Sequence, residues 1–191
     1  MHQVSFRRMD EGTPADYALL NRLEDEFVAA LPERILAALN GLEQSLTGYQ
    51  ISRLEHSLQS ATRAERDGAD IEMIVGALIH DLGDDLAPLN HSQLASAIIR
   101  PYVRDEVAWV IEHHGVFQMY YYGDAMGVDK NAREIYRSHK WFDSCENFCE
   151  RWDQMSFDPD YTSYPLAHFE PMVREIFLRP PFDPHIVGDE S

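Results

Sequence analysis

The sequence predicts an all-α protein, a helical bundle, on three observations. Apolar residues recur at the three- and four-residue spacing of one helix face along almost the whole chain. The alternating pattern typical of strands is scarce. Pro32 and Pro101 fall at the ends of apolar stripes, where a helix would stop, and Gly83 lies where a C-cap glycine would.

The individual helices follow from these stripes. They are expected over about residues 17–31, 35–42, 51–68, 73–82, 91–98, 107–114, 145–152 and 166–176. Segment 73–82 is apolar on every side, which implies a buried helix. Segments 115–130 and 154–165 are expected to be loops.

Composition sets broad limits on what the chain binds. Its 191 residues are 45% hydrophobic, which suits a single globular domain with its own core. The net charge of −17 disfavours binding to nucleic acid or to anionic membranes. No signal peptide or apolar run of ~18 residues is visible. We therefore expect a cytoplasmic protein, with Cys145 and Cys149 reduced.

Polar residues at buried positions are the first indication of chemistry. His80 and Asp81 end the helix that is apolar all round, where a carboxylate is costly unless it is paired or bound to a metal. Capping or an ordinary hydrogen bond would explain that dipeptide alone. His91 and His114 also occupy apolar stripes. One such histidine is usually a satisfied core residue, but several together need partners, which a metal supplies.

Two further candidates carry weaker signals. His56 lies opposite the stripe formed by Leu54 and Leu58, so it is either exposed or on a helix covered from two sides. The small residues of that helix permit the second arrangement. Asp153 follows a late apolar stripe and by itself would pass for a surface aspartate.

The order of these residues resembles the HD superfamily in its six-ligand, two-metal form, over roughly residues 49–155. The resemblance implies a single HD domain spanning 1–191, with N-terminal helices in 1–48 packed on the 49–155 core and a C-terminal helix in 156–191. It implies that Asp81 bridges two metals. One metal would be held by His56, His80, Asp81 and Asp153, and the other by Asp81, His91 and His114. Such a donor set suits iron or manganese, with zinc possible.

Longer motifs are similar to one branch of this superfamily, the mixed-valent di-iron oxygenases that cleave phosphonates. They are residues 54–59, 67–73, 77–83, 111–114 and 151–153. The resemblance implies two iron ions, Fe(II) and Fe(III), that use O2 to cleave the C–P bond of a small 1-hydroxyalkylphosphonate. The implied substrate is (R)-1-hydroxy-2-(trimethylammonio)ethylphosphonate, which yields glycine betaine and phosphate. The alternatives are a two-metal phosphohydrolase acting on a nucleotide or phosphoester, and a non-enzymatic metal-binding module.

Departures from that branch suggest the residues that meet the substrate. Asp84 replaces a histidine of the aminoethyl-specific relatives, and Leu46 and Tyr49 replace their lid residues. Tyr49 is therefore expected to cap the open metal position. Asp84 is expected to face the positive nitrogen of the substrate, unless it only caps the helix or orients a metal-bound water.

Aromatic and basic side chains complete the expected substrate site. The aromatic candidates for a cation cage are Phe117, Tyr120, Tyr121, Tyr122 and Trp141, although ordinary packing explains them equally well. Arg151, two residues from Asp153, is the expected donor to the phosphonate. Gln118 falls near the position of the family's phosphonate-binding lysine.

Overall fold

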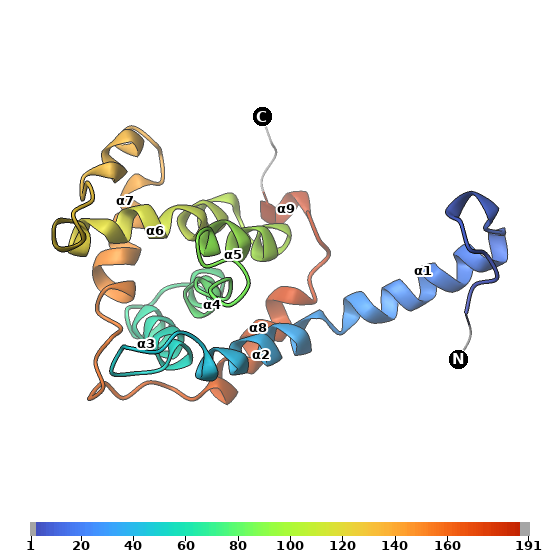
Figure 1. The fold of residues 1–191 in the computed structure, drawn as a ribbon, viewed down its shortest axis with the longest axis horizontal. Coiled ribbons are helices and arrows are strands. Elements are labelled where there is room, and N and C mark those ends of the chain that lie inside the picture. Colours follow the sequence, from blue (N-terminus) through green and yellow to red (C-terminus); the bar gives the residue numbers. More distant parts are fainter. Residues whose placement is uncertain (1–2, 188–191) are drawn as a thin grey trace.

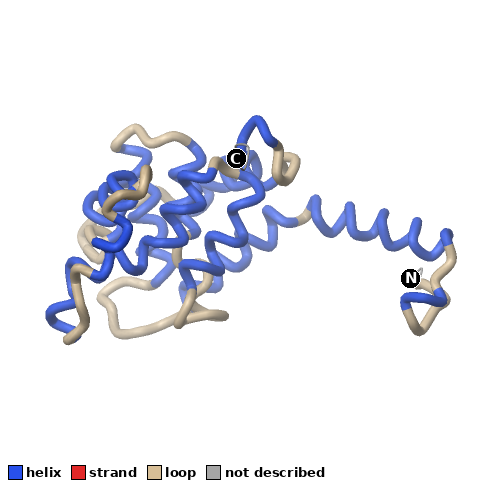
Figure 2. The backbone as a smooth tube through the Cα atoms, turned by 90° about the horizontal axis from the view of Figure 1, so that it is seen from above, coloured by secondary structure: helices blue, strands red, loops and turns tan. Residues whose placement is uncertain are grey.

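The computed structural model describes residues 3–187, and within that range every regular element is a helix (Figures 1 and 2). The predicted all-α class is confirmed. The α-helices are α1 (Pro14–Ala29), α2 (Leu31–Gly41), α3 (Arg53–Arg66), α4 (Ile71–Ile79), α5 (His91–Ile99), α6 (Asp105–Met126), α7 (Phe142–Phe148), α8 (Leu166–Phe177) and α9 (Pro184–Val187). Short 3₁₀ turns are η1 (Met9–Glu11), η2 (Leu42–Gln44), η3 (Arg100–Tyr102) and η4 (Ala132–Tyr136). A π-helical turn, η5 (Cys149–Asp153), follows α7.

Side-chain caps define where several of these helices begin. The Thr13 hydroxyl accepts from the backbone N–H of Asp16, whose carboxylate accepts from the N–H of Thr13, and Pro14 follows at the first helical position of α1. Ser52 caps α3, and Asp70 caps α4 in the same way. These local signals lie within three residues of each helix start.

Helix α4 forms the centre of the bundle. It packs against α3, α6 and α8, and Figure 1 shows it enclosed by its neighbours. Val75, Leu78 and Ile79 have no exposed surface, so the prediction of a buried helix is confirmed. Because α4 ends at Ile79, the next residues leave the helix axis within the protein interior.

The N-terminal helices differ in how they meet the bundle. Ile35, Leu36 and Leu39 of α2 are buried, and α2 packs on α8 and α3. Helix α1 projects away from the other helices (Figures 1 and 2), and Leu23 and Phe27 on its apolar stripe are 41% and 62% exposed. None of the described helices combines the length and apolarity that crossing a bilayer requires.

Helix α6 is longer than predicted, and the expectation of a loop over 115–130 is wrong for its first part. Two glycines of this stretch are packing positions inside the helix. A Cβ on Gly115 would lie 2.9 Å from the Ser92 hydroxyl, and one on Gly123 would lie 3.0 Å from the backbone of Lys130. The helix ends instead at Gly127, which has a left-handed φ of 71°. Residues 154–165 contain no helix, as predicted.

Gly83 is also a packing position and not the C-cap of α4. It lies in the turns between α4 and α5, and a Cβ there would be 2.6 Å from the carbonyl oxygen of His91. The absence of a side chain lets the first turn of α5 approach the end of α4.

Replacing Gly83 should therefore destabilise the fold. We expect Gly83→Ala to lower the free energy of unfolding by about 1–3 kcal/mol, the usual cost of overpacking. Urea denaturation monitored by circular dichroism measures this. Gly41→Ala is the matched control, because a Cβ there meets nothing within 4 Å and alanine favours a helix. Equal effects of the two substitutions would contradict the packing role.

Candidate metal centre

The fold brings histidine and aspartate side chains from separate elements to one buried point. The contributing elements are α3, the turn after α4, the first residue of α5, the middle of α6 and the end of η5. They supply His56, His80, Asp81, His91, His114 and Asp153. All except His91 are buried. These are the residues that the sequence pattern indicated as metal ligands.

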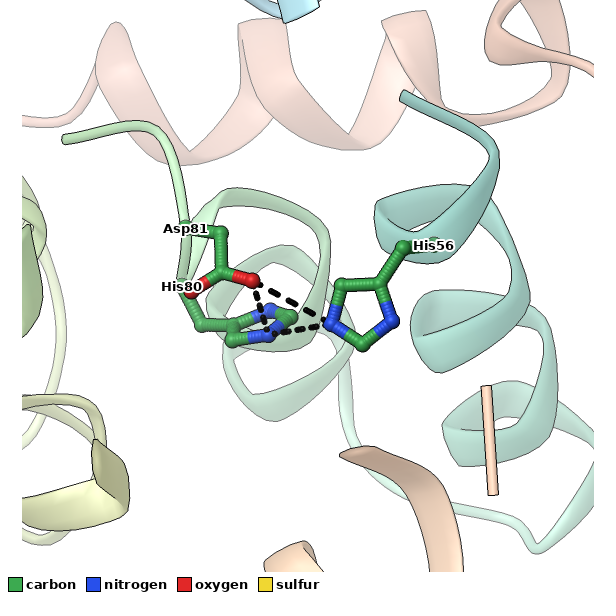
Figure 3. A group of neighbouring side chains, drawn as sticks. All are labelled: His56, His80 and Asp81. Atoms are coloured by element: carbon green, nitrogen blue, oxygen red, sulfur yellow. Dashed lines mark hydrogen bonds and ion pairs between the residues drawn. The ribbon is translucent and has the colours of Figure 1, made fainter. Parts of the chain in front are cut away.

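Asp81 lies between two pairs of imidazoles. Its Oδ2 is 3.2 Å from Nε2 of His56 and 3.1 Å from Nε2 of His80 (Figure 3). Its Oδ1 is 3.4 Å from Nε2 of both His91 and His114. Each carboxylate oxygen thus faces its own pair, which is the arrangement of a carboxylate that bridges two ions.

Backbone carbonyls orient three of the imidazoles. A carbonyl oxygen only accepts hydrogen bonds, so an Nδ1 facing it carries the proton and a neutral ring presents its lone pair at Nε2. Each of these hydrogen bonds is 2.7 Å long. They join His56 Nδ1 to Ser156 O, His80 Nδ1 to Ala77 O and His114 Nδ1 to Ile111 O. The ligand nitrogens therefore point toward the centre, as in metal sites with an outer shell of acceptors.

Asp153 completes the group around His56 and His80. Its Oδ1 is 3.3 Å from Nε2 of His56 and 3.6 Å from Nε2 of His80. The residue ends the π-helical turn η5, a local widening of the helix that is common at functional sites. Asp153 also forms a possible metal-binding group with His80 and His114.

The donor set fits a metal on two observations. Nε2 of His56 and Nε2 of His80 are 3.1 Å apart, and their lone pairs would repel unless a proton or a cation lies between them. Oδ2 of Asp153 is buried and has no hydrogen-bond partner among the described residues. Buried polar atoms are rarely left without a partner, so this oxygen indicates a missing ligand.

The electrostatics of the cluster favour positive charge at its centre. Burial lowers the pKa of His80, but the charge of Asp81 and hydrogen bonds to Asp153 and Asp81 outweigh it, so the pKa is raised well above its usual value. Burial raises the pKa of Asp81, but His80 and Arg53 hold it well below the usual range. A metal ion competes with protons for this field.

A cavity of about 890 Å³ opens over the cluster. Tyr49, Asp84 and Gln118, which the sequence indicated as substrate or catalytic residues, line it. Tyr121 and Tyr122 line it as well. The volume is within the range of small-molecule sites, so the metal cluster forms the floor of a substrate-sized cleft.

Other expected substrate residues lie elsewhere. Tyr120 is outside the lining of this cavity, and the Arg133 guanidinium stacks on its ring at 3.7 Å. Arg151 is exposed and pairs with Asp67 at 2.9 Å. Phe117 is buried in the core, and Trp141 packs against it without lining the cavity.

The structure adds Arg53 and Phe157 to the site. Arg53 is buried, and it donates to Asp81 and to Asp84. Phe157 stacks on the ring of His56, with centroids 4.3 Å apart. Arg53 lies one turn before His56 on the same helix, a spacing that could have indicated it. Phe157 lies in a segment without helical periodicity and carries no comparable signal.

Comparison with known protein families agrees with a metal-binding site at this position. Residues 53–146 match the model described as the HD domain. The chain contains an HD domain. The matched segment includes all the clustered histidines and Asp81, while Asp153 lies beyond it.

One curated relative also matches. The HD-domain chain is 28% identical over 106 residues to a [1-hydroxy-2-(trimethylamino)ethyl]phosphonate dioxygenase (glycine-betaine-forming) from Leisingera caerulea. The alignment covers 50% of this chain and 51% of that protein, so the chain spans about half the length of its curated relative.

The division of ligands predicts how the centre responds to loss of one histidine. His91 belongs only to the group with Asp81 and His114. Elemental analysis of iron-loaded protein should therefore give close to two ions for the wild type and close to one for His91→Ala. His113→Ala is the control, because His113 bonds the carbonyl of Trp109 and belongs to none of the groups. A single ion in the wild type would contradict a two-metal centre.

Proposed function

We propose that this HD-domain protein is a di-iron oxygenase that uses O2 to cleave the C–P bond of a 1-hydroxyalkylphosphonate. The observation that carries the proposal is the Asp81 carboxylate, which faces one imidazole pair with each oxygen beneath a substrate-sized cavity. The activity of the relative that aligns over half of its length supports the reaction class. The reaction balances, since one oxygen atom of O2 enters the carboxylate product and the other enters phosphate.

The donor set determines which metal is proposed. The clustered ligands are imidazoles and carboxylates, and the buried Cys145 and Cys149 are not among them. Such ligands suit iron or manganese more than soft metals. We propose a mixed-valent Fe(II)/Fe(III) pair held by the two ligand groups, which would bind the hydroxyphosphonate and O2 and supply the redox chemistry.

Gln118 is proposed to position the substrate. Its Nε2 donates to Oδ1 of Asp153 over 3.0 Å, which fixes the amide beside the cluster. Its Oε1 is buried and has no partner among the described residues. That oxygen is suited to accept a hydrogen bond from the substrate hydroxyl at the cavity floor.

Tyr49 is proposed to cover the mouth of the cavity. It is half exposed, and its ring packs on Phe157 with centroids 5.1 Å apart. Phe157 in turn stacks on His56. The ring of Tyr49 is thus connected to a proposed ligand through one intervening aromatic side chain, and its movement would open or close the site to water.

The oxygenase proposal predicts strict dependence on O2. Iron-loaded protein should consume O2 and release phosphate from (R)-1-hydroxy-2-(trimethylammonio)ethylphosphonate in equal amounts, and turnover should stop under argon. An oxygen electrode and a phosphate assay measure both quantities. Hydrolysis of nucleotides or phosphoesters that continues without O2 would show that the protein is a two-metal phosphohydrolase instead.

The aromatic lining predicts a preference for a cationic substrate. Tyr122 lines the cavity together with Tyr49 and Phe157. A cation–π contact contributes ~0.5–2 kcal/mol, so Tyr122→Leu should lower kcat/KM for the trimethylammonio substrate by about 2- to 30-fold relative to a neutral tert-butyl analogue. Tyr120→Leu, outside the cavity lining, should leave that ratio unchanged. Equal losses on the two substrates would remove Tyr122 from the cation site.

A further inference from the structure

Arg53 links the metal cluster to a second carboxylate. It begins α3, one turn before His56, and only 7% of its surface is exposed. Its Nη2 donates to Oδ2 of Asp81, and its Nε donates to Oδ2 of Asp84 over 2.8 Å. One buried guanidinium therefore holds two carboxylates at the same time.

This pairing bears on whether Asp84 can bind a substrate cation. Its side chain is 12% exposed, and one of its oxygens accepts from Arg53. The charge of Asp84 is therefore already compensated by a buried cation of the protein. A trimethylammonium group, which cannot donate an N–H hydrogen bond, would compete with a charge-assisted hydrogen bond at that carboxylate.

The second oxygen of Asp84 faces the metal cluster. Oδ1 of Asp84 lies 3.6 Å from Nδ1 of His91, while Nε2 of His91 lies 3.4 Å from Oδ1 of Asp81. In His56, His80 and His114, a backbone carbonyl faces Nδ1. In His91 the carboxylate of Asp84 takes that place.

His91 needs such a partner more than the other imidazoles do. Its side chain is 26% exposed, and it is the first residue of α5, after the turns that begin at His80. Asp84 is fixed near it by those turns, since the N–H of Asp84 donates to the carbonyl of Asp81. The 3.6 Å separation between Oδ1 of Asp84 and Nδ1 of His91 is an ion-pair distance, longer than a hydrogen bond. A carboxylate on that side of the ring sets the tautomer and the direction of Nε2 in metal-binding histidines.

We infer that Asp84, anchored by Arg53, is a positioning residue that orients His91 for the ion shared by Asp81, His91 and His114, and that it does not contact the substrate. The inference rests on the metal centre of the proposed function. It assigns Arg53 a structural task at the same time: its two donated bonds keep Asp81 and Asp84 at a constant separation on either side of His91.

The test is an anaerobic titration of metal-free protein with Fe²⁺, in which calorimetry measures the affinity of each ion. Wild type should bind two ions. In Asp84→Asn one ion should bind as in wild type and the other should bind about 10- to 100-fold more weakly, the usual effect of losing an outer-shell partner. Asp84→Glu, which keeps the carboxylate, should recover part of the affinity.

Asp85→Asn is the matched control. Asp85 is the next residue and also lines the cavity, but its carboxylate is exposed and accepts from the Ser45 hydroxyl. In Asp85→Asn, both iron ions should bind as in wild type. If Asp84→Asn does not fold, Asp84→Ser provides the second variant, because it also removes the carboxylate beside His91 without altering the residues that contact Asp81, and the same ion should again be weakened selectively.

Each result has one interpretation. If wild type binds two ions and Asp84→Asn binds both equally well, the positioning role is wrong while the metal centre stands. Equal weakening of both ions with a matching loss of folding stability would also overturn it. If wild type binds fewer than two ions, the two-metal proposal itself fails and this inference fails with it. A loss of kcat/KM confined to the trimethylammonio substrate, with iron binding intact, would make Asp84 a substrate contact.

Discussion

The structure depends on the compensation of one buried carboxylate, that of Asp81. An uncompensated charge in a protein interior costs several kcal/mol, and Asp81 is only 3% exposed. Arg53 donates to it, and four imidazoles approach it with Nε2, where a proton or a metal ion would complete the compensation. Because these partners come from separate helices, the positions of those helices are coupled through a single side chain.

That coupling explains several features of the fold that are not explained by apolar packing. α4 ends inside the protein, so that His80 and Asp81 leave the helix where the other ligands converge. Gly83 lets the start of α5 approach closely, and Gly115 lets α6 pack on Ser92. The π-helical turn at the end of α7 brings Asp153 to the remaining side. Glycine and an irregular helix occur where the ligands require close approach.

The same arrangement separates two chemical environments. On one side of the cavity, the carbonyl-oriented imidazoles and paired carboxylates form a polar cluster that suits hard cations. Elsewhere the cavity is lined by aromatic side chains, those of Tyr49, Tyr122 and Phe157. The proposed substrate, whose phosphonate would meet the metals and whose trimethylammonium group would meet the aromatic rings, would suit both environments. The strongly acidic surface of the chain, with a net charge of −17, does not determine the character of this cleft.

The sequence indicated the helical class because helical periodicity is local. It indicated His80, Asp81, His91 and His114 because polar residues on apolar faces need partners, whereas His56 and Asp153 were indicated only by the resemblance to the HD superfamily. It failed for residues 115–126, which were expected to form a loop but continue helix α6, where Gly115 and Gly123 make close contacts with α5 and with the backbone of Lys130. The aromatic run 117–122 allowed either a cation cage or ordinary packing. Phe117 is a core residue and Tyr120 lies under Arg133, whereas Tyr121 and Tyr122 line the cavity.

By itself, the sequence determined the all-α class, the buried α4 and the polar residues at apolar positions, namely His80, Asp81, His91 and His114, because each depends on residue type and spacing along one segment. Only the tertiary structure decided that Arg53 joins Asp81 to Asp84, and that Phe157 stacks on His56 across a separation of about a hundred residues. These contacts join segments whose relative positions are set by the packing of the whole bundle. No pattern within a single helix encodes them.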